Sequence, residues 1–350
     1  MKKRSLMLAA SLGALALTSC TPGGGGETAD GGGGGASRLD TVLARGQLIC
    51  GVDGGIPGFS FVDNGEYSGL DVDVCKAVAA ALFDDPNAVE YRNLDSTERF
   101  EALKGGEVDM LSRNTTWTIS RDTSVGMEFG PTTFYDGQGM MVRESSGISD
   151  LQGLEGGTVC VEAGTTTELN LTDQFRQLGI NATPQTFQSA DAAYAAYEAG
   201  SCEGMTSDKS QLVARRSTLS NPDEHVLLDV TMSKEPLGPL TTNNDSAWFD
   251  AVKWTTYALI QAEEFGLTAD NIAEAANSDN PDIKRFVGAE GTLGEDMGLP
   301  NDFAARAVSA VGNYGEIFER NLGSGSQFEL DRGQNALYTN GGLMYSPPFR

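Results

Sequence analysis

This sequence has almost no histidine, and its cysteines are not clustered. The chain has 350 residues, one histidine (His225) and five cysteines that do not follow zinc-binding spacing. This scarcity argues against a multi-histidine metal site and against a histidine-based catalytic triad. We therefore expect neither a metal nor a cofactor. We expect His225 to lie at the surface, where a strand begins.

Positive charge is also scarce. The 24 Lys and Arg residues face 49 Asp and Glu residues, which gives a formal net charge of −25. Proteins that bind nucleic acid present basic surfaces, so this composition excludes that class. We interpret the acidity as a solvated surface and not as an acidic binding face. The length allows two domains, each with its own core.

A long hydrophobic run is missing as well, apart from a short one at the N-terminus. Leu6–Leu17 follows Lys2-Lys3-Arg4 and is too short to span a bilayer comfortably, so residues 1–19 are interpreted as a signal peptide. The sequence Leu17-Thr18-Ser19-Cys20 resembles a bacterial lipobox, in which Cys20 would carry the lipid. The alternative is ordinary secretion with Cys20 as a spare thiol.

Residues 20–37 contain two glycine runs, at 23–26 and 31–35. Such a segment cannot bury enough apolar surface to fold, so we expect a flexible tether after the lipidated cysteine. Together the N-terminal signals predict a globular body in the periplasm, anchored to the membrane as a lipoprotein.

The other four cysteines lie in the expected globular part, and an exported protein occupies an oxidising compartment where disulfides form. We predict Cys50–Cys75 and Cys160–Cys202, one pair in each half of the fold. Four buried free thiols are the alternative.

Strand-like and helix-like segments alternate in two sets. The first set runs from residue 47 to 111, with helices expected at 71–83 and 96–104, and the second runs from 158 to 230. Alternation of this kind predicts an α/β fold with mainly parallel sheets covered by helices. The second set lies inside the first, which predicts one lobe at 38–135 plus 235–350 and another at 136–234. Two segments near 134–139 and 231–235 would cross between them.

The C-terminal third adds helices. A long helix is expected at 246–265 and another at 301–322, the latter interrupted by Gly312 and Gly315. The aromatic and proline-rich tail at 338–350 is expected to pack against the first lobe.

One loop carries most of the chemistry. Residues 112–122, SRNTTWTISRD, follow the short apolar strand at 108–111 and precede a helix for which Ser120 is a candidate N-cap. Ligands of open α/β sheets bind outside the carboxyl ends of strands, and arginine pairs with carboxylates through two hydrogen bonds. We therefore expect this loop to bind the head group of a small zwitterion or anion. A capped and solvated surface loop is the alternative.

The second lobe offers complementary groups. The loop Glu162–Thr167 places threonines and free amides at a helix N-terminus, where an anion is favoured. Asp208 follows another strand and would suit an ammonium. Both features are also compatible with simple helix capping. Taken with Arg121, they describe a cleft that closes on a zwitterion.

Several stretches together resemble the solute-binding proteins of polar amino-acid ABC transporters. Residues 69–82 (GLDVDVCKAVAAAL) match that family's first-helix pattern, and residues 103–109 (LKGGEVD) with the loop to Arg121 extend the match. The sequences SRNTTWT at 112–118, NDFAARA at 301–307 and GLMYSPP at 342–348 resemble the general L-amino-acid-binding subfamily. The resemblance extends from about residue 38 to the end of the chain.

This resemblance implies a type II periplasmic-binding-protein fold, two α/β lobes that close on one amino acid and deliver it to an ABC permease. It implies that Arg121 binds the α-carboxylate and that Asp208 binds the α-ammonium. By the same resemblance, the further contacts to the head group and the side-chain pocket come from Thr116, Thr166, Asn114, Asp53, Ile56, Ser96 and Arg113.

The sequence departs from the family at two of these positions. An aromatic residue is frequent where Ile56 stands, and serine is frequent where Arg113 stands. Arg113 would then favour acidic or amide side chains, or form an internal salt bridge. We expect Arg113 and Trp117 to decide which side chains are accepted. The alternatives on the same fold are a periplasmic dehydratase of the cyclohexadienyl type and a ligand-sensing module.

Overall fold

The structure is a computed structural model that describes residues 37–350. The predicted signal peptide, the lipidation of Cys20 and nearly all of the glycine-rich tether lie outside the described residues. Within residues 37–350, none of the helices combines the length and apolarity needed to cross a membrane.

Lobe 1, as we call it, is built on a five-stranded sheet. The strands lie in the order β5 (Val89–Asn93), β1 (Leu48–Val52), β6 (Met110–Leu111), β15 (Leu240–Thr242) and β7 (Met127–Phe129). β1 pairs in parallel with β5 and β6, whereas β15 is antiparallel to β6 and β7. The sheet is therefore mixed, because β15 enters it from the segment that comes back from the other lobe.

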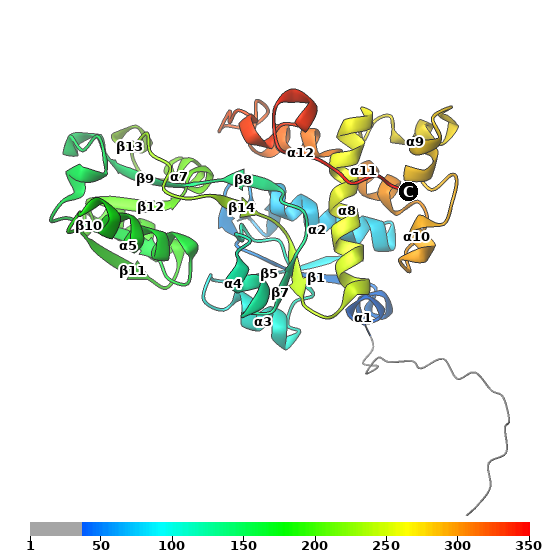
Figure 1. Cartoon of the computed structure of the whole chain (residues 1–350), viewed down its shortest axis with the longest axis horizontal. Coiled ribbons are helices and arrows are strands. Elements are labelled where there is room, and N and C mark those ends of the chain that lie inside the picture. Colours follow the sequence, from blue (N-terminus) through cyan, green and yellow to red (C-terminus); the bar gives the residue numbers. More distant parts are fainter. Residues whose placement is uncertain (1–36) are drawn as a thin grey trace, which may run out of the picture. The chain divides into compact units, whose positions relative to one another are not determined.

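A short three-stranded sheet and most of the helices complete lobe 1. The small sheet contains β2 (Gly55–Ile56), β3 (Ser60–Asp63) and β4 (Glu66–Ser68), with a turn between β3 and β4. The helices are α1 (Arg38–Arg45), α2 (Leu70–Phe83), α3 (Arg99–Gly105), α4 (Ile119–Thr123), α8 (Ser246–Phe265), α9 (Pro281–Phe286), α10 (Leu293–Asp296), α11 (Phe303–Val311) and α12 (Tyr314–Asn321). Figure 1 shows α2 and α8 crossing the same region of this lobe, where they contact each other.

Lobe 2, defined in the same way, repeats the pattern with a second five-stranded sheet. Its strands lie in the order β11 (Thr183–Phe187), β10 (Thr158–Glu162), β12 (Gly204–Asp208), β9 (Gln138–Arg143) and β13 (His225–Leu227). β10 is parallel to β11 and β12, and β9 is antiparallel to β12 and β13. The helices are α5 (Thr166–Leu178), α6 (Ala190–Glu198) and α7 (Lys209–Arg216).

Two strands carry the chain from one lobe to the other. β8 (Phe134–Asp136) leads into lobe 2 and β14 (Glu235–Leu237) leads back, and the two pair antiparallel (Figure 1). The crossing segments expected near 134–139 and 231–235 are thus present as a two-stranded hinge. This pairing fixes Asp136 directly opposite Glu235.

Each lobe has its own buried core, and each contains one disulfide. The largest cluster of buried apolar side chains joins β1, α2, α8 and α11 in lobe 1, and separate clusters lie on the two faces of the lobe 2 sheet. The disulfides are Cys50–Cys75 and Cys160–Cys202, and both predictions are confirmed.

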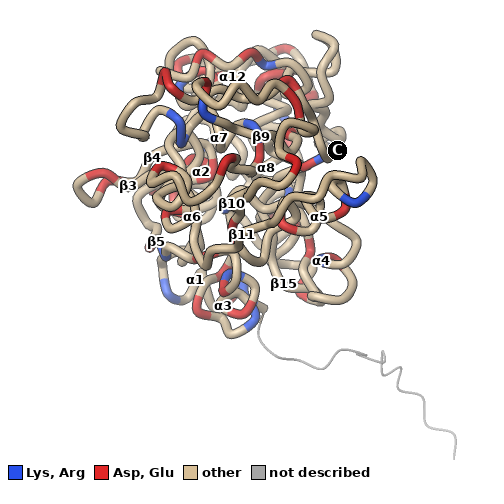
Figure 2. The backbone as a smooth tube through the Cα atoms, turned by 90° about the vertical axis from the view of Figure 1, so that its left-hand side faces the viewer, with Lys and Arg blue, Asp and Glu red and all other residues tan. Residues whose placement is uncertain are grey.

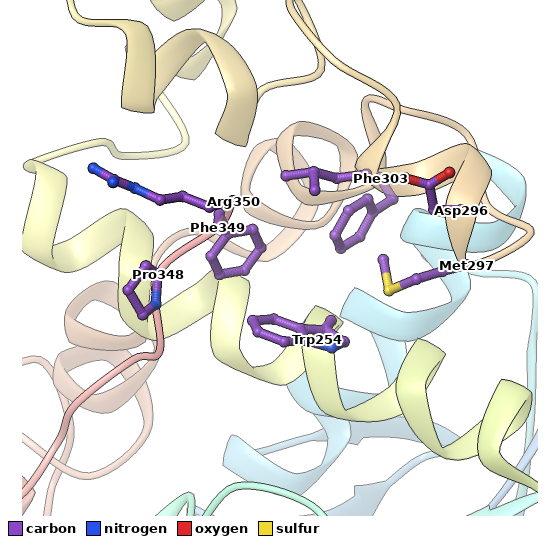
Figure 3. A pocket seen from close by; sticks show the side chains of 8 residues that line it. Trp254, Asp296, Met297, Phe303, Pro348, Phe349 and Arg350 are labelled. Atoms are coloured by element: carbon purple, nitrogen blue, oxygen red, sulfur yellow. The ribbon is translucent and has the colours of Figure 1, made fainter.

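The C-terminal tail packs on lobe 1, as expected. The Phe349 ring lies 5.2 Å from Trp254 and 5.1 Å from Phe286, measured between centroids, in edge-to-face geometry. Figure 3 shows Phe349 turned toward Trp254 and Phe303 across a small cavity. The backbone N–H of Ser346 donates to Glu264 of α8 over 2.9 Å, which adds a polar contact.

Two local predictions are wrong, and a third is right in part. α3 begins at Arg99 and not at Ser96, so Ser96 lies in the preceding loop. Thr118, not Ser120, is the N-cap of α4, because its hydroxyl accepts from the Arg121 N–H. The helical stretch expected at 301–322 is interrupted at Gly312 as predicted, where φ is 83°, but Gly315 lies inside α12 and does not interrupt it.

His225 begins β13 as expected, but it is buried and not at the surface. Its Nδ1 lies 2.9 Å from the Tyr197 hydroxyl, which occupies one ring nitrogen.

The acidic residues are spread over elements of the whole described chain and interspersed with basic ones, as Figure 2 shows. This distribution fits the interpretation of the net charge as a solvated surface.

Candidate functional site

A polar cavity lies between the two lobes, at the carboxyl ends of β6, β10 and β12. Its free volume is about 20 Å³. Lobe 1 contributes Ser96, Arg99, Arg113, Asn114, Thr116 and Arg121, and lobe 2 contributes Glu162, Thr165, Thr166, Thr167, Ser207, Asp208 and Gln211. Seven of the ten residues predicted for the ligand site are in this set: Ser96, Arg113, Asn114, Thr116, Arg121, Thr166 and Asp208.

Arg121 presents a guanidinium that has no acidic partner. It is buried in α4, and its Nη1 donates to the Thr116 carbonyl oxygen over 2.7 Å. Within the described part of the chain, Arg121 forms no ion pair. Burial lowers the pKa of Arg121 to about 10, while Glu235 and Asp208 act in the opposite direction. The group stays charged at neutral pH, so it suits a carboxylate from outside the protein.

Asp208 is the complementary feature in lobe 2. It stands at the N-cap position of α7, yet its side chain makes no capping hydrogen bond. Its Oδ1 is buried and finds no hydrogen-bond partner within residues 37–350. Burial, followed by the charges of Asp136 and Glu235, raises the pKa of this carboxyl well above its usual value. A cation beside Asp208 would reverse this effect, and an ammonium group supplies one.

Asn114 and Ser96 add further unused polar groups. Both Oδ1 and Nδ2 of Asn114 are buried without partners among the described residues, and the same holds for the Ser96 hydroxyl. The backbone of Asn114 is held in place, because its N–H donates to Asp71 of α2 over 2.9 Å; its φ is 42°. Buried polar groups in proteins are nearly always hydrogen-bonded, so this set of unused groups points to a polar ligand.

Thr116 and Thr166 do line the cavity, but their hydroxyl protons have another acceptor. Both hydroxyls donate to Oε2 of Glu235, over 2.6 and 2.8 Å. The other oxygen of Glu235 accepts from Asn170 over 3.0 Å and from Ser233. The expected contacts of Thr116 and Thr166 to a ligand carboxylate, through hydroxyl or amide, stay a prediction. A buried hinge carboxylate, which the sequence analysis did not single out, accepts from both hydroxyls.

Arg113 is paired inside the protein. Its Nη2 lies 2.6 Å from Asp53 in lobe 1 and 3.5 Å from Glu162 in lobe 2, and its Nε donates to the Leu94 carbonyl. Of the two roles considered for Arg113, the internal salt bridge is the one present. Asp53 acts as its partner and does not line the cavity. The pair lies at the wall of the site and links the lobes through Glu162.

Ile56 and Trp117 lie away from the cavity, contrary to expectation. Ile56 is 1% exposed and packs in the core of lobe 1. Trp117 is 45% exposed and stacks on Phe129, with ring centroids 6.0 Å apart. The reason is the alternation of side chains at 116–117: an isolated bridge between Thr116 and Leu237 turns Thr116 inward, which directs the next side chain outward.

Six lining residues were not among the predicted ones: Arg99, Glu162, Thr165, Thr167, Ser207 and Gln211. Four of them stand next to residues that were predicted, in the loop at 162–167 and beside Asp208. Arg99 had no such signal, because the expected helix start at Ser96 made it an ordinary helical residue. The actual start of α3 at Arg99 directs it to the site.

Further contacts hold the two lobes together around the cavity. The Ser96 N–H donates to Glu162 over 3.4 Å, and the Thr116 and Thr166 hydroxyls lie 3.4 Å apart. At the other side, Arg215 of α7 donates to the Gly55 carbonyl over 2.6 Å and also pairs with Asp191. These contacts require the lobes to be closed.

A second cavity, of about 180 Å³, lies under the C-terminal tail (Figure 3). It is larger, but its lining is mostly apolar: Trp254, Leu293, Met297, Phe303, Pro348 and Phe349, with Asp296 and Arg350 at its margin. None of its lining residues has a buried polar side-chain atom without a partner. The cavity between the lobes is therefore the better candidate for a specific polar ligand.

Comparison with known proteins agrees with this geometry. The family of bacterial extracellular solute-binding proteins, family 3, matches residues 48–285. The general L-amino acid-binding periplasmic protein AapJ of Rhizobium johnstonii is 52% identical over 318 residues, which cover 90% of this chain and 93% of AapJ. The glutamate/glutamine/aspartate/asparagine-binding protein BztA of Rhodobacter capsulatus is 50% identical over 344 residues, which cover 98% of this chain and 99% of BztA.

A solved structure shares the fold. An ABC transporter/periplasmic binding protein from Brucella ovis with glutathione bound superposes with a TM-score of 0.88 at 49% identity, covering 90% of this chain and all of that one. The two mixed sheets, the paired crossing strands and the interlobe cavity are the features of a type II periplasmic-binding-protein fold. The chain belongs to the bacterial extracellular solute-binding proteins, family 3.

Proposed function

We propose that this protein binds L-amino acids in the cavity between its lobes and delivers them to the permease of an ABC transporter. Arg121 binds the α-carboxylate and Asp208 binds the α-ammonium. Asn114 contributes hydrogen bonds to the ligand, and Ser96 and Arg113 belong to the wall around its side chain. No covalent step is part of this function, and the ligand leaves unchanged when the lobes open.

One observation carries this proposal. Arg121 and Asp208 lie on opposite lobes, both are buried, and neither forms an ion pair within the described part of the chain. A buried unpaired charge is costly, and a zwitterion that bridges the two would remove the cost on both sides at once. Because the charges come from different lobes, ligand binding and lobe closure support each other.

Relatives support the ligand class. AapJ and BztA are named for binding amino acids, and both cover almost the full length of this chain. The Brucella ovis protein holds glutathione, which also carries an α-amino acid group. The free volume of the closed cavity, about 20 Å³, is smaller than an amino acid, so we expect the lobes to move apart when the ligand enters.

The periplasm is the compartment in which this protein works. AapJ and the Brucella ovis protein are both named as periplasmic, and the N-terminal targeting pattern supports the same location. We further propose that residues 1–19 are removed and that the protein is held at the membrane through a lipid on Cys20, with residues 21–37 as the tether. The lobes then divide at 38–135 plus 235–350 and at 136–234.

A thermal-shift screen against the common L-amino acids tests the function. A ligand that binds only the folded state stabilises it by about 2.7 kcal/mol at a concentration of one hundred times the Kd. We expect a rise in Tm with one or more L-amino acids and none with their D-enantiomers, because Arg121 and Asp208 fix the head group in one orientation. A flat response to all of them, each present at millimolar concentration, would contradict the proposal.

A further inference from the structure

Arg99 is a further buried cation in the cavity, and the amino-acid head group does not explain it. It is the first residue of α3, it is 2% exposed, and it lines the cavity. Its Nη1 donates to the Thr115 hydroxyl over 3.2 Å, and its guanidinium lies 4.9 Å from the centroid of the Phe100 ring. Its Nε is buried and has no acceptor within residues 37–350.

The three arginines of the cavity differ in their partners. Arg113 is neutralised by Asp53 at 2.6 Å and also approaches Glu162. Arg121 is accounted for by the ligand's α-carboxylate. Arg99 forms no ion pair with any residue of the described chain, and burial together with the neighbouring arginines lowers its pKa well below the usual value. A cation kept at such a cost, next to the site, needs an anion that the protein itself does not supply.

The unpaired charges of the cavity can be counted. Arg99 and Arg121 are positive, and Asp208 is negative. Glu162 shares Arg113 with Asp53, and Glu235 is satisfied by four hydroxyl and amide donors. Arg99 and Arg121 are therefore the two arginines of the cavity that no carboxylate of the described residues pairs with. A neutral zwitterion would leave one arginine unpaired, whereas a ligand with two carboxylates and one ammonium would match all three groups.

We propose that Arg99 binds a second carboxylate, so that the cavity prefers dicarboxylic amino acids to the amides of the same shape. The inference rests on the proposed function, because it takes the head group to be held by Arg121 and Asp208. Arg99 then determines specificity for the side chain. The sequence analysis expected Arg113 and Trp117 to decide which side chains are accepted. Arg99 takes this role, since Arg113 is paired inside the protein and Trp117 lies outside the cavity.

Calorimetric titration of the full chain with matched ligands tests this inference. The pairs are L-glutamate with L-glutamine and L-aspartate with L-asparagine, in which the carboxylate is replaced by an amide of nearly equal size. In the wild type we expect at least one acid to bind about tenfold or more tightly than its amide, the least that a charge-assisted hydrogen bond contributes.

The variant Arg99→Gln is expected to reduce that preference to about twofold or less, while the affinity for the amide changes by less than about threefold. Arg99→Lys keeps the charge and should retain a preference for the acid. Arg92→Gln, which removes an exposed arginine of β5 that pairs with Glu90, is the matched control and should leave the ratio unchanged. These variants separate a side-chain role of Arg99 from a general effect of charge.

The possible outcomes are distinguishable. If the wild type binds no amino acid, the proposed function itself fails. If the wild type binds amino acids but takes the amides as tightly as the acids, the function stands and the role of Arg99 is refuted, whether or not the variant folds. If the preference exists but survives in a folded Arg99→Gln protein, another group carries it and the inference is equally overturned.

Discussion

The hydroxyl oxygens of Thr116 and Thr166 lie 3.4 Å apart, one on each lobe, and both donate to the same oxygen of Glu235. Glu235 begins β14, the strand on which the chain returns from lobe 2. A single buried carboxylate of the hinge therefore connects the two lobes at the edge of the cavity. Opening the cleft must break at least one of these hydrogen bonds.

The variant Glu235→Gln tests this connection. Glutamine keeps the shape, but its NH₂ group would face donors where an acceptor is needed. We expect the free energy of unfolding to fall by about 1–3 kcal/mol, in the range found when a buried hydrogen bond to a charged group is lost. We also expect the radius of gyration of the ligand-free protein to rise in X-ray scattering as the lobes separate.

Glu101→Gln is the control, because Glu101 is exposed and pairs only with Lys104 on the surface of α3. It should change stability by less than about 0.5 kcal/mol. Equal denaturation midpoints for Glu235→Gln and Glu101→Gln, with unchanged scattering, would show that Glu235 does not hold the lobes together.

At pH values below the raised pKa of Asp208, ligand binding should release a proton from its carboxyl group. Burial and the nearby carboxylates Asp136 and Glu235 raise that pKa, while Arg121 and Arg99 lower it. The ligand's ammonium favours the ionised form, so affinity should increase with pH up to the pKa of the free protein and then level off. Calorimetry in two buffers of different ionisation enthalpy measures the released proton. An affinity independent of pH between 4 and 8 would refute this, and Asp208→Asn should remove both proton release and tight binding.

Asp71 should make stability depend on pH. It is buried in α2, where it accepts from the Ser112 hydroxyl over 3.1 Å and from the Asn114 N–H, and burial raises its pKa from 3.8 to about 7. The folded state thus binds this proton more tightly than the unfolded state. The resulting stability is fully present below about pH 4 and is lost as the pH rises through 7, by at most about 4 kcal/mol.

The comparison of Asp71→Asn with the wild type isolates this effect. Asparagine keeps an acceptor for the Asn114 N–H and does not titrate. The loss of Tm between pH 5 and pH 8 should be smaller in the variant than in the wild type. Parallel Tm curves for the two proteins over this range would count against a titrating Asp71.

The disulfide of lobe 2 should contribute measurably to stability. Cys160 and Cys202 are separated by 42 residues, and loop-closure entropy predicts about 4 kcal/mol for a loop of this length. The double variant Cys160→Ser with Cys202→Ser is expected to lose stability of this order in chemical denaturation. If the wild type, treated with reductant, unfolds at the same denaturant concentration as the oxidised protein, neither disulfide contributes.

The order of the elements could be predicted because local patterns determine it. The periodicity of α8, the alanine-rich stretch of α2 and the turn at 63–65 are local signals, and the structure matches them closely. Nested repetition of the strand–helix pattern also indicated two lobes. The antiparallel strands β9 and β15 could not be predicted in the same way, since their direction depends on where the returning chain enters each sheet.

Only part of the site could be predicted, for a similar reason. Asp208 ends β12, and Asn114 and Arg121 lie in the segment that follows β6, so the rule that ligands bind at strand ends applies to them. It does not apply to Glu235 and Arg99. Glu235 reaches the site because β14 pairs with β8, and Arg99 reaches it because α3 starts three residues later than its polar flanking residues suggest. Both depend on contacts between segments that are distant in sequence or on an exact helix boundary.

Calorimetric titration of Arg121→Ala with the amino acid that binds the wild type best tests the central claim most directly. Removing one partner of a buried ion pair costs about 3–5 kcal/mol, which corresponds to a loss of at least a hundredfold in affinity. The control Arg306→Ala removes an arginine on α11 that pairs with Asp302 and does not line the cavity, and it should bind as the wild type does. We expect Arg121→Ala to remain folded and to show no measurable binding. Unchanged affinity in the folded variant would contradict the assignment of the ligand to the cavity between the lobes.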